Sequence, residues 1–130
     1  MNKEACAAQM MELPNGKSIY EEHLADYEEI LLHVLASELI SQPLIELLCL
    51  NKQCDLINQY CDMVELMWRD GTEDVVNVVD VTILERLSDE EMIWKRFGEY
   101  ISDEFRRYIN EELLPQNDMM GGVKPLHEKG

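Results

Sequence analysis

Apolar positions recur at spacings of three and four residues along most of the chain, the period of an α-helix with one buried face. The clearest run passes through Tyr20, Leu24, Tyr27 and Leu31 and predicts a helix over residues 18–41. The alternation of apolar and polar residues that marks a half-buried strand is not sustained. The pattern therefore predicts an all-α fold.

Turn residues and prolines divide the rest of the chain into further helices. Pro43 is expected to stop or kink a helix, and Gly98 is expected to break one. The valine-rich segment 73–81 has strand propensity, but the spacing of Val76, Val79 and Ile83 fits a helix. The other predicted helices cover residues 1–13, 44–50, 52–69, 72–87, 88–97 and 100–113.

The short connection between the helices at 52–69 and 72–87 predicts an antiparallel helix hairpin. A chain of 130 residues with 46% apolar residues is long enough for one domain with its own core. We expect a compact bundle of about five to seven helices over residues 1–115. Residues 116–130 are polar and contain Gly121-Gly122, so we expect a flexible tail.

The charge is strongly acidic and unevenly distributed. The chain has 27 acidic and 11 basic side chains, a net charge of −16. Residues 18–85 hold 15 acidic and two basic side chains, a net charge of −13. Such a field repels nucleic acid and anionic lipid and attracts basic proteins. Solubility alone is the simpler explanation, and it stays open at this point.

The cysteines and the apolar segments point to a cytoplasmic protein. Cys6, Cys49, Cys54 and Cys61 form no CxxC pair and are interpreted as reduced thiols. The first 14 residues lack the apolar stretch of a signal peptide. No uninterrupted apolar stretch approaches the roughly 18 residues of a membrane span, so no membrane association is expected.

Residues that carry chemistry are scarce. The three histidines occur at no metal-ligand spacing, and the phosphate-binding and nucleophile motifs of common enzymes are absent. Adjacent carboxylates such as Glu28-Glu29 point about 100° apart on a helix and are interpreted as solvated charge. We expect no catalytic residue, no metal site and no cofactor. The late bases, such as Arg96 and Arg106, are expected to pair with neighbouring acids.

Two segments resemble a known family. The first is Tyr20-Glu-Glu-His-Leu-Ala-Asp-Tyr-Glu-Glu-Ile-Leu-Leu-His-Val-Leu35, and the second is Asp70-Gly-Thr-Glu-Asp-Val-Val-Asn-Val-Val-Asp-Val-Thr-Ile-Leu-Glu-Arg-Leu87. Together they resemble small helical bacterial immunity proteins, the partners of polymorphic and contact-dependent growth inhibition toxins. Leu32 stands where that family commonly has proline, and Val81-Thr82-Ile83 stands where it has Val-Ser-Phe.

The resemblance implies an immunity protein that neutralises a cognate toxin by binding it. Such toxins are often nucleases, whose basic cleft an acidic surface can cover. The alternatives left open are a homodimeric adaptor, for which eight methionines would suit an adaptable surface, and a DNA-mimicking inhibitor of another enzyme. The candidate partner-binding carboxylates are Asp26, Glu28, Glu29, Asp55, Asp62, Asp70, Glu73, Asp74 and Asp80.

Overall fold

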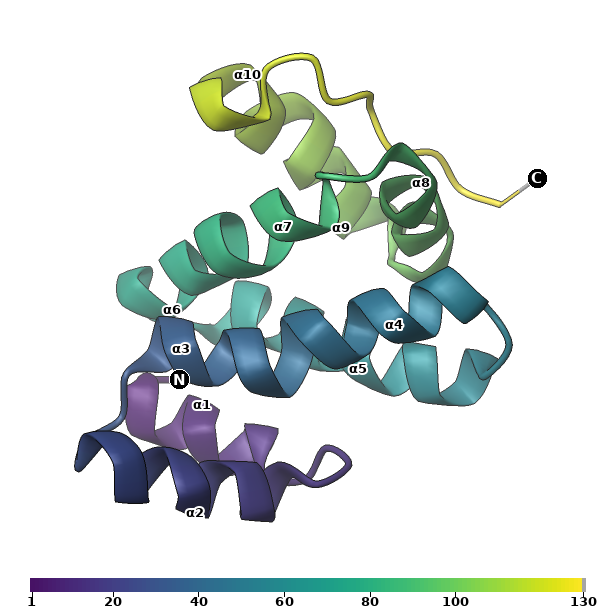
Figure 1. The fold of residues 1–130 in the computed structure, drawn as a ribbon. Coiled ribbons are helices and arrows are strands. Elements are labelled where there is room, and N and C mark those ends of the chain that lie inside the picture. Colours follow the sequence, from purple (N-terminus) through teal and green to yellow (C-terminus); the bar gives the residue numbers. More distant parts are fainter. Residues whose placement is uncertain (130) are drawn as a thin grey trace.

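The computed structural model describes residues 1–129, and within them the chain forms seven continuous helices and no strand (Figure 1). The prediction of a compact all-α bundle is therefore confirmed. Four helices are regular: α1 (Lys3–Met10), α2 (Gly16–Tyr27), α5 (Cys54–Asp70) and α8 (Glu91–Tyr100).

The other three helices each contain a π-helical turn. The α3–α4 helix consists of α3 (Leu32–Ala36), the π turn Ser37–Ser41 and α4 (Gln42–Leu50). The α6–α7 helix consists of α6 (Glu73–Val78), the π turn Val79–Leu84 and α7 (Glu85–Leu87). The α9–α10 helix consists of α9 (Asp103–Tyr108), the π turn Ile109–Leu113 and α10 (Leu114–Gln116). A single 3₁₀ turn, Asp118–Met120, follows.

Proline explains two of the three π turns. Pro43 and Pro115 each lie two residues after the end of a π turn, in the first turn of α4 and α10. A proline inside an α-helix lacks the N–H and clashes with the carbonyl four residues earlier. The wider π turn moves that carbonyl aside and lets the helix continue. The prediction that Pro43 stops the helix is wrong, since the chain stays helical from Leu32 to Leu50.

The predicted helix over residues 18–41 is wrong, because the chain breaks after Tyr27. Glu28 has a left-handed backbone (φ 63°) and ends α2, its N–H donating to the Leu24 carbonyl at 2.8 Å. The buried His23 accepts the N–H of Leu31 at its Nε2, at 3.0 Å. These bonds close the connection 28–31, so α2 packs back along the α3–α4 helix.

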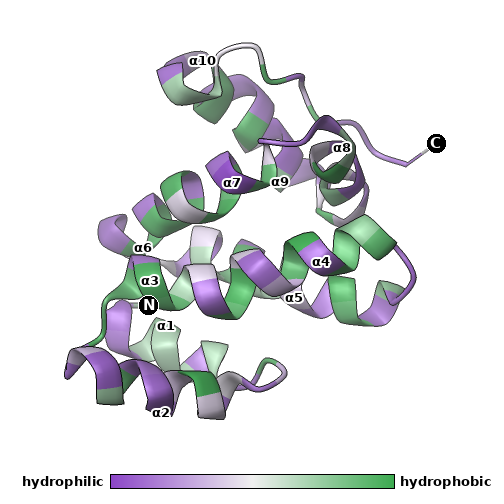
Figure 2. Cartoon of the chain, viewed as in Figure 1, coloured by the Kyte–Doolittle hydropathy of each residue, from purple (hydrophilic) through white to green (hydrophobic). Residues whose placement is uncertain are grey.

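The core lies between α5 and the helices packed around it. Figure 2 shows the α3–α4 helix largely apolar along its length, and α2 largely polar. Residues 32–50 are long and apolar enough to cross a membrane. Leu35, Leu39 and Leu44 of this segment are fully buried in the bundle, the arrangement expected of a central core helix. An aromatic cluster joins α5 to α9, with Trp68 stacked on Phe105 at 4.8 Å between ring centroids.

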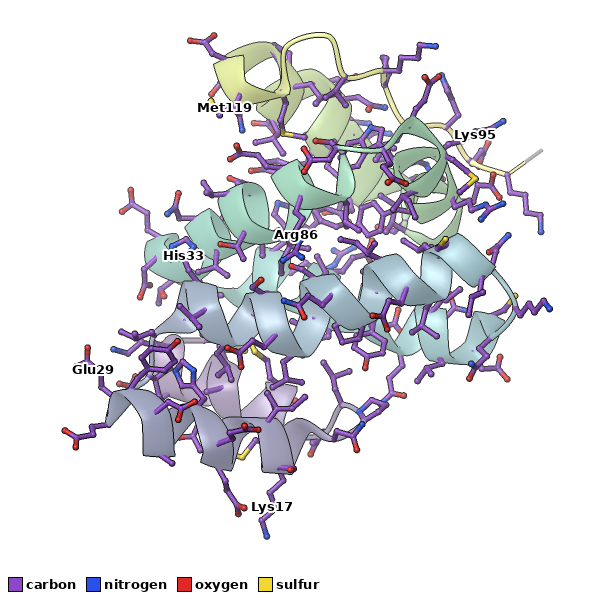
Figure 3. The ribbon with its side chains drawn as sticks, in the orientation of Figure 1. Lys17, Glu29, His33, Arg86, Lys95 and Met119 are labelled. Carbon is purple, nitrogen blue, oxygen red and sulfur yellow. The ribbon has the colours of Figure 1, made fainter. Side chains whose placement is uncertain are left out.

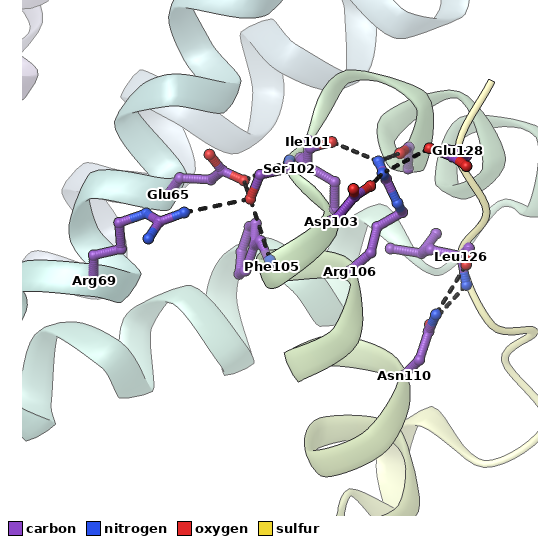
Figure 4. Close-up of polar contacts among 11 residues, drawn as sticks. Glu65, Arg69, Ile101, Ser102, Asp103, Phe105, Arg106, Asn110, Leu126 and Glu128 are labelled. Carbon is purple, nitrogen blue, oxygen red and sulfur yellow. Dashed lines mark hydrogen bonds and ion pairs between the residues drawn. The ribbon is translucent and has the colours of Figure 1, made fainter.

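The segment after α10 lies along α8 and α9. Asn110 donates to the Leu126 carbonyl at 2.9 Å and accepts the Leu126 N–H at 2.7 Å (Figure 4). Trp94 donates to the Lys124 carbonyl at 2.9 Å, and Leu126 is buried against Gly98. The predicted break at Gly98 is wrong, since this glycine lies within α8 and leaves room for the tail. The predicted flexibility of residues 116–130 concerns motion and stays a prediction.

Candidate partner-binding surface

Most carboxylates of the described chain have no basic partner. Residues 1–129 contain all 27 acidic side chains, and four of them lie within 4.0 Å of a basic group, which leaves 23 without one. The four paired carboxylates belong to Glu91, Asp103, Glu104 and Glu128. An acidic surface with so few internal partners keeps its attraction for a basic protein.

Several basic side chains are used inside the fold. Arg96 donates to the carbonyls of Leu48 and Cys49, both at 2.8 Å, and so caps the C-terminal end of α4. Arg106 is buried and donates to the Gly98 carbonyl at 2.8 Å and to the Asp103 carboxylate (Figure 4). The expected pairing of late bases with nearby acids is therefore confirmed for Arg106 and replaced by backbone contacts for Arg96.

Six of the nine predicted carboxylates lie at one end of the bundle. This acidic end consists of Asp26, Glu28, Glu29, Asp70, Glu73 and Asp74, all exposed. The C-terminal end of α2, the start of α3 and the start of α6 lie on one side of the molecule in Figure 1, and α3 packs against α6. Figure 3 shows Glu29 projecting from this end.

Local structure positions these carboxylates. Glu28 and Glu29 occupy the turn that His23 holds against Leu31. Glu73 and Asp74 open α6, where a negative charge suits the helix dipole. The Thr72 hydroxyl donates to the Asp74 carboxylate, and this hydrogen bond lowers the pKa of Asp74 below its usual value. Asp74 therefore stays ionised at neutral pH.

The remaining three predicted carboxylates lie elsewhere. Asp55 and Asp62 are exposed on α5, Asp55 in its first turn and Asp62 near its middle. Asp80 is half-buried in the π turn of the α6–α7 helix. Asp80 lines a groove whose other carboxylates were not among the predicted residues.

This acidic groove, of about 750 Å³, lies between the α6–α7 helix and the α9–α10 helix. Its lining holds four carboxylates and no basic side chain. It also includes two of the five large apolar side chains that are exposed in residues 1–129, Val81 and Met119. The lining residues are Asn77, Asp80, Val81, Glu85, Tyr108, Glu112, Leu113, Gln116, Asn117, Asp118 and Met119.

Asp80 and Tyr108 connect the two walls of the groove. The Tyr108 hydroxyl lies 2.9 Å from both carboxylate oxygens of Asp80 and donates to them. Burial raises the pKa of Asp80 above its usual value, although the hydrogen bond from Tyr108 opposes that rise. Burial and the contact with Asp80 raise the pKa of Tyr108 well above its ordinary value. Asp80 is thus a carboxylate whose charge the fold only partly compensates.

Sequence reasoning missed Glu85, Glu112, Asp118 and the two apolar side chains of the groove. A partial signal was present, because Val81 and Glu85 lie four residues apart on one helical face, as do Tyr108 and Glu112. The sequence contains no signal for the meeting of those two faces across the groove. That meeting depends on how α9 packs on α5.

No histidine or cysteine of residues 1–129 lines the acidic groove. No group of three or more His, Cys, Asp or Glu in residues 1–129 is arranged to hold a metal ion. His33 lies 2.5 Å from the Thr82 hydroxyl, a contact between the α3–α4 and α6–α7 helices. Beside it, Arg86 donates to the Ser37 hydroxyl at 2.7 Å (Figure 3). The four cysteines are free thiols, two of them buried.

The sequence matches the model of a protein family. The model of a family described as a domain of unknown function (DUF7674) matches residues 10–115. No curated protein and no solved structure matches the chain. The matched residues contain the whole acidic end and most of the acidic groove.

Proposed function

Because the chain belongs to the DUF7674 family, a domain of unknown function, its role has to be inferred from its own surface, and we propose that it is an immunity protein. In this proposal it binds a cognate toxin domain with a basic surface and neutralises it. The toxin is a nuclease whose phosphate-binding cleft the carboxylates cover. The protein acts in the cytoplasm, by binding and without catalysis.

The observation that carries the proposal is the uncompensated acidic surface. With 23 carboxylates of residues 1–129 lacking a basic partner, the folded chain has a strong negative field. Self-repulsion of this kind destabilises a compact protein, and binding of a basic partner relieves it. Helices hold the backbone of most of these carboxylates at fixed positions, so binding has to order side chains but little backbone.

The resemblance to immunity proteins supports the assignment of this acidic surface to partner binding. The first resembling segment, Tyr20–Leu35, forms most of α2, the turn and the start of α3. The second, Asp70–Leu87, forms the α6–α7 helix and the corner before it. The two segments together supply all six carboxylates of the acidic end and, through Asp80, one wall of the acidic groove.

Co-expression tests the proposal. The chain would be produced with an affinity tag together with the catalytically inactivated product of the adjacent gene, and the complex purified. We expect a stoichiometric complex whose association slows steeply as salt is raised, because long-range attraction is screened. Absence of any complex at low salt would contradict the proposal.

Two further measurements, size-exclusion chromatography of the chain alone and competition with duplex DNA, distinguish the two alternatives. A homodimeric adaptor would elute as a stable dimer by itself, in the absence of any neighbouring gene product. A DNA mimic would compete with duplex DNA for an enzyme that is encoded elsewhere. An immunity protein is expected to be captured by its neighbour alone.

A further inference from the structure

We propose that the acidic groove receives a basic segment of the partner protein, one that carries an apolar side chain next to its lysines or arginines. The inference rests on the proposed function and deepens it, because it assigns the main docking contact to one place. The groove has a volume in the range of ligand pockets, so it admits several side chains at once.

The charges of the groove define the polar half of its occupant. Asp80, Glu85, Glu112 and Asp118 line it, and none of them forms an ion pair with a basic side chain in residues 1–129. Two of the four come from the α6–α7 helix and two from the α9–α10 helix and the turn after it. A basic side chain entering the groove would therefore meet carboxylates from both walls.

The exposed apolar side chains define the other half. The side chain of Met119 is 83% exposed and that of Val81 is 45% exposed. Met119 is held by its neighbours, because its N–H donates to the Asn117 side chain at 2.9 Å and the next residue, Met120, is buried. A methionine presented in this way beside carboxylates suits an adaptable contact with an apolar side chain of a partner.

The backbone of both walls is irregular where the groove is lined. Asp80 and Val81 belong to the π turn Val79–Leu84, and Glu112 and Leu113 belong to the π turn Ile109–Leu113. The second of these turns precedes Pro115, but no proline follows the first. Proline therefore does not account for the first turn, and π turns, which are rare, occur frequently at functional sites. The first turn lies at Asp80 and Val81.

Matched charge removal tests the groove. One variant combines Glu85→Gln, Glu112→Gln and Asp118→Asn. The control combines Glu21→Gln, Glu22→Gln and Glu46→Gln, three carboxylates that are exposed outside the groove and outside the acidic end. Both variants change the net charge by the same amount, and circular dichroism would establish that both are folded.

Two probes are titrated by fluorescence anisotropy at physiological salt. They are the inactivated product of the adjacent gene and a fluorescein-labelled amphipathic peptide of lysine and leucine. For both probes we expect the groove variant to bind about ten- to a hundred-fold more weakly than wild type, and the control within about three-fold. Equal weakening in the two variants, or no weakening in the groove variant, would overturn the groove assignment. If the gene product fails to bind wild type, the proposed function fails, and the peptide decides on the groove alone.

A second pair of variants tests the apolar contact without a change of charge. Met119→Ala is compared with Leu50→Ala, whose leucine is 65% exposed and lies at the end of α4. We expect Met119→Ala to weaken binding of both probes about three- to ten-fold and Leu50→Ala to leave it unchanged. A Met119→Ala protein that binds as tightly as wild type would remove the apolar half of the proposed occupant.

Discussion

Replacing Asp80 with asparagine should make the protein more stable and weaken partner binding. Since burial raises the pKa of Asp80 despite the hydrogen bonds from Tyr108, the ionised carboxylate disfavours the folded state at neutral pH. One pKa unit corresponds to about 1.4 kcal/mol, and partial exposure reduces that figure. We expect Asp80→Asn to raise the free energy of unfolding by about 0–1 kcal/mol at pH 7.

The pH dependence gives the sign of this effect independently. An acid with a raised folded-state pKa contributes stability below its unfolded pKa and loses it as pH rises through the folded value. The advantage of Asp80→Asn should therefore disappear below about pH 4, where the wild-type carboxyl is protonated in both states. Above that pH the advantage should grow and then become constant.

Tyr108→Phe is the counterpart that separates burial from hydrogen bonding. It removes a hydroxyl that donates to both Asp80 oxygens at 2.9 Å. Loss of a hydrogen bond to a half-buried carboxylate should cost about 1–2 kcal/mol. In the Asp80→Asn background the same change should cost less, a coupling of about 1 kcal/mol.

Urea unfolding followed by far-UV circular dichroism measures all four members of this cycle. The reasoning would be refuted if Asp80→Asn lowered the free energy of unfolding by more than about 1 kcal/mol. Asp80 would then be a structural residue whose charge the fold requires.

Three further predictions follow from burial and hydrogen bonding. Two of the four thiols should react with a thiol-specific reagent in the native protein, and the other two only after unfolding. Burial shields the second pair and raises the pKa of both its thiols, that of Cys6 to about 12. The exposed thiols are Cys49 and Cys54, and the buried ones are Cys6 and Cys61. Asn110→Ala removes both bonds to Leu126, and it should cost about 1–2 kcal/mol and speed hydrogen exchange at the Leu126 amide. Stability should fall as pH rises above about 10, through the raised folded-state pKa of Tyr108, and Tyr108→Phe should lessen that fall in alkaline urea titrations.

Helical periodicity predicted the class of the fold and the position of most helices. The predicted helices at 52–69 and 72–87 correspond to α5 and the α6–α7 helix. The valine-rich segment is helical because its apolar residues recur at helical spacing and are buried in the core. Strand propensity was the weaker signal, since tertiary packing decides such segments.

The break after Tyr27 had no local signal. A left-handed residue at the end of a helix is usually glycine or asparagine, and here it is Glu28. The contact that stabilises the turn joins His23 to Leu31, eight residues apart. The periodic run across this segment was real, but it belongs to two helices that pack against each other.

The candidate surface was predicted in part. Charge counting along the chain identified all six carboxylates of the acidic end, which lie where α2 ends and where α5 ends and α6 begins. The acidic groove combines residues 77–85 with residues 108–119, and the sequence does not encode that approach in any local pattern. The packing of Trp68 against Phe105 and Tyr108 brings the two walls together.

Growth rescue tests the central claim most directly. The active product of the adjacent gene would be induced in a bacterial host together with wild-type chain, the groove variant or its charge-matched control. The proposal predicts that wild type and control restore growth, and that the groove variant requires higher expression to do so. Unchanged growth arrest in the presence of abundant, folded wild-type chain would contradict an immunity function.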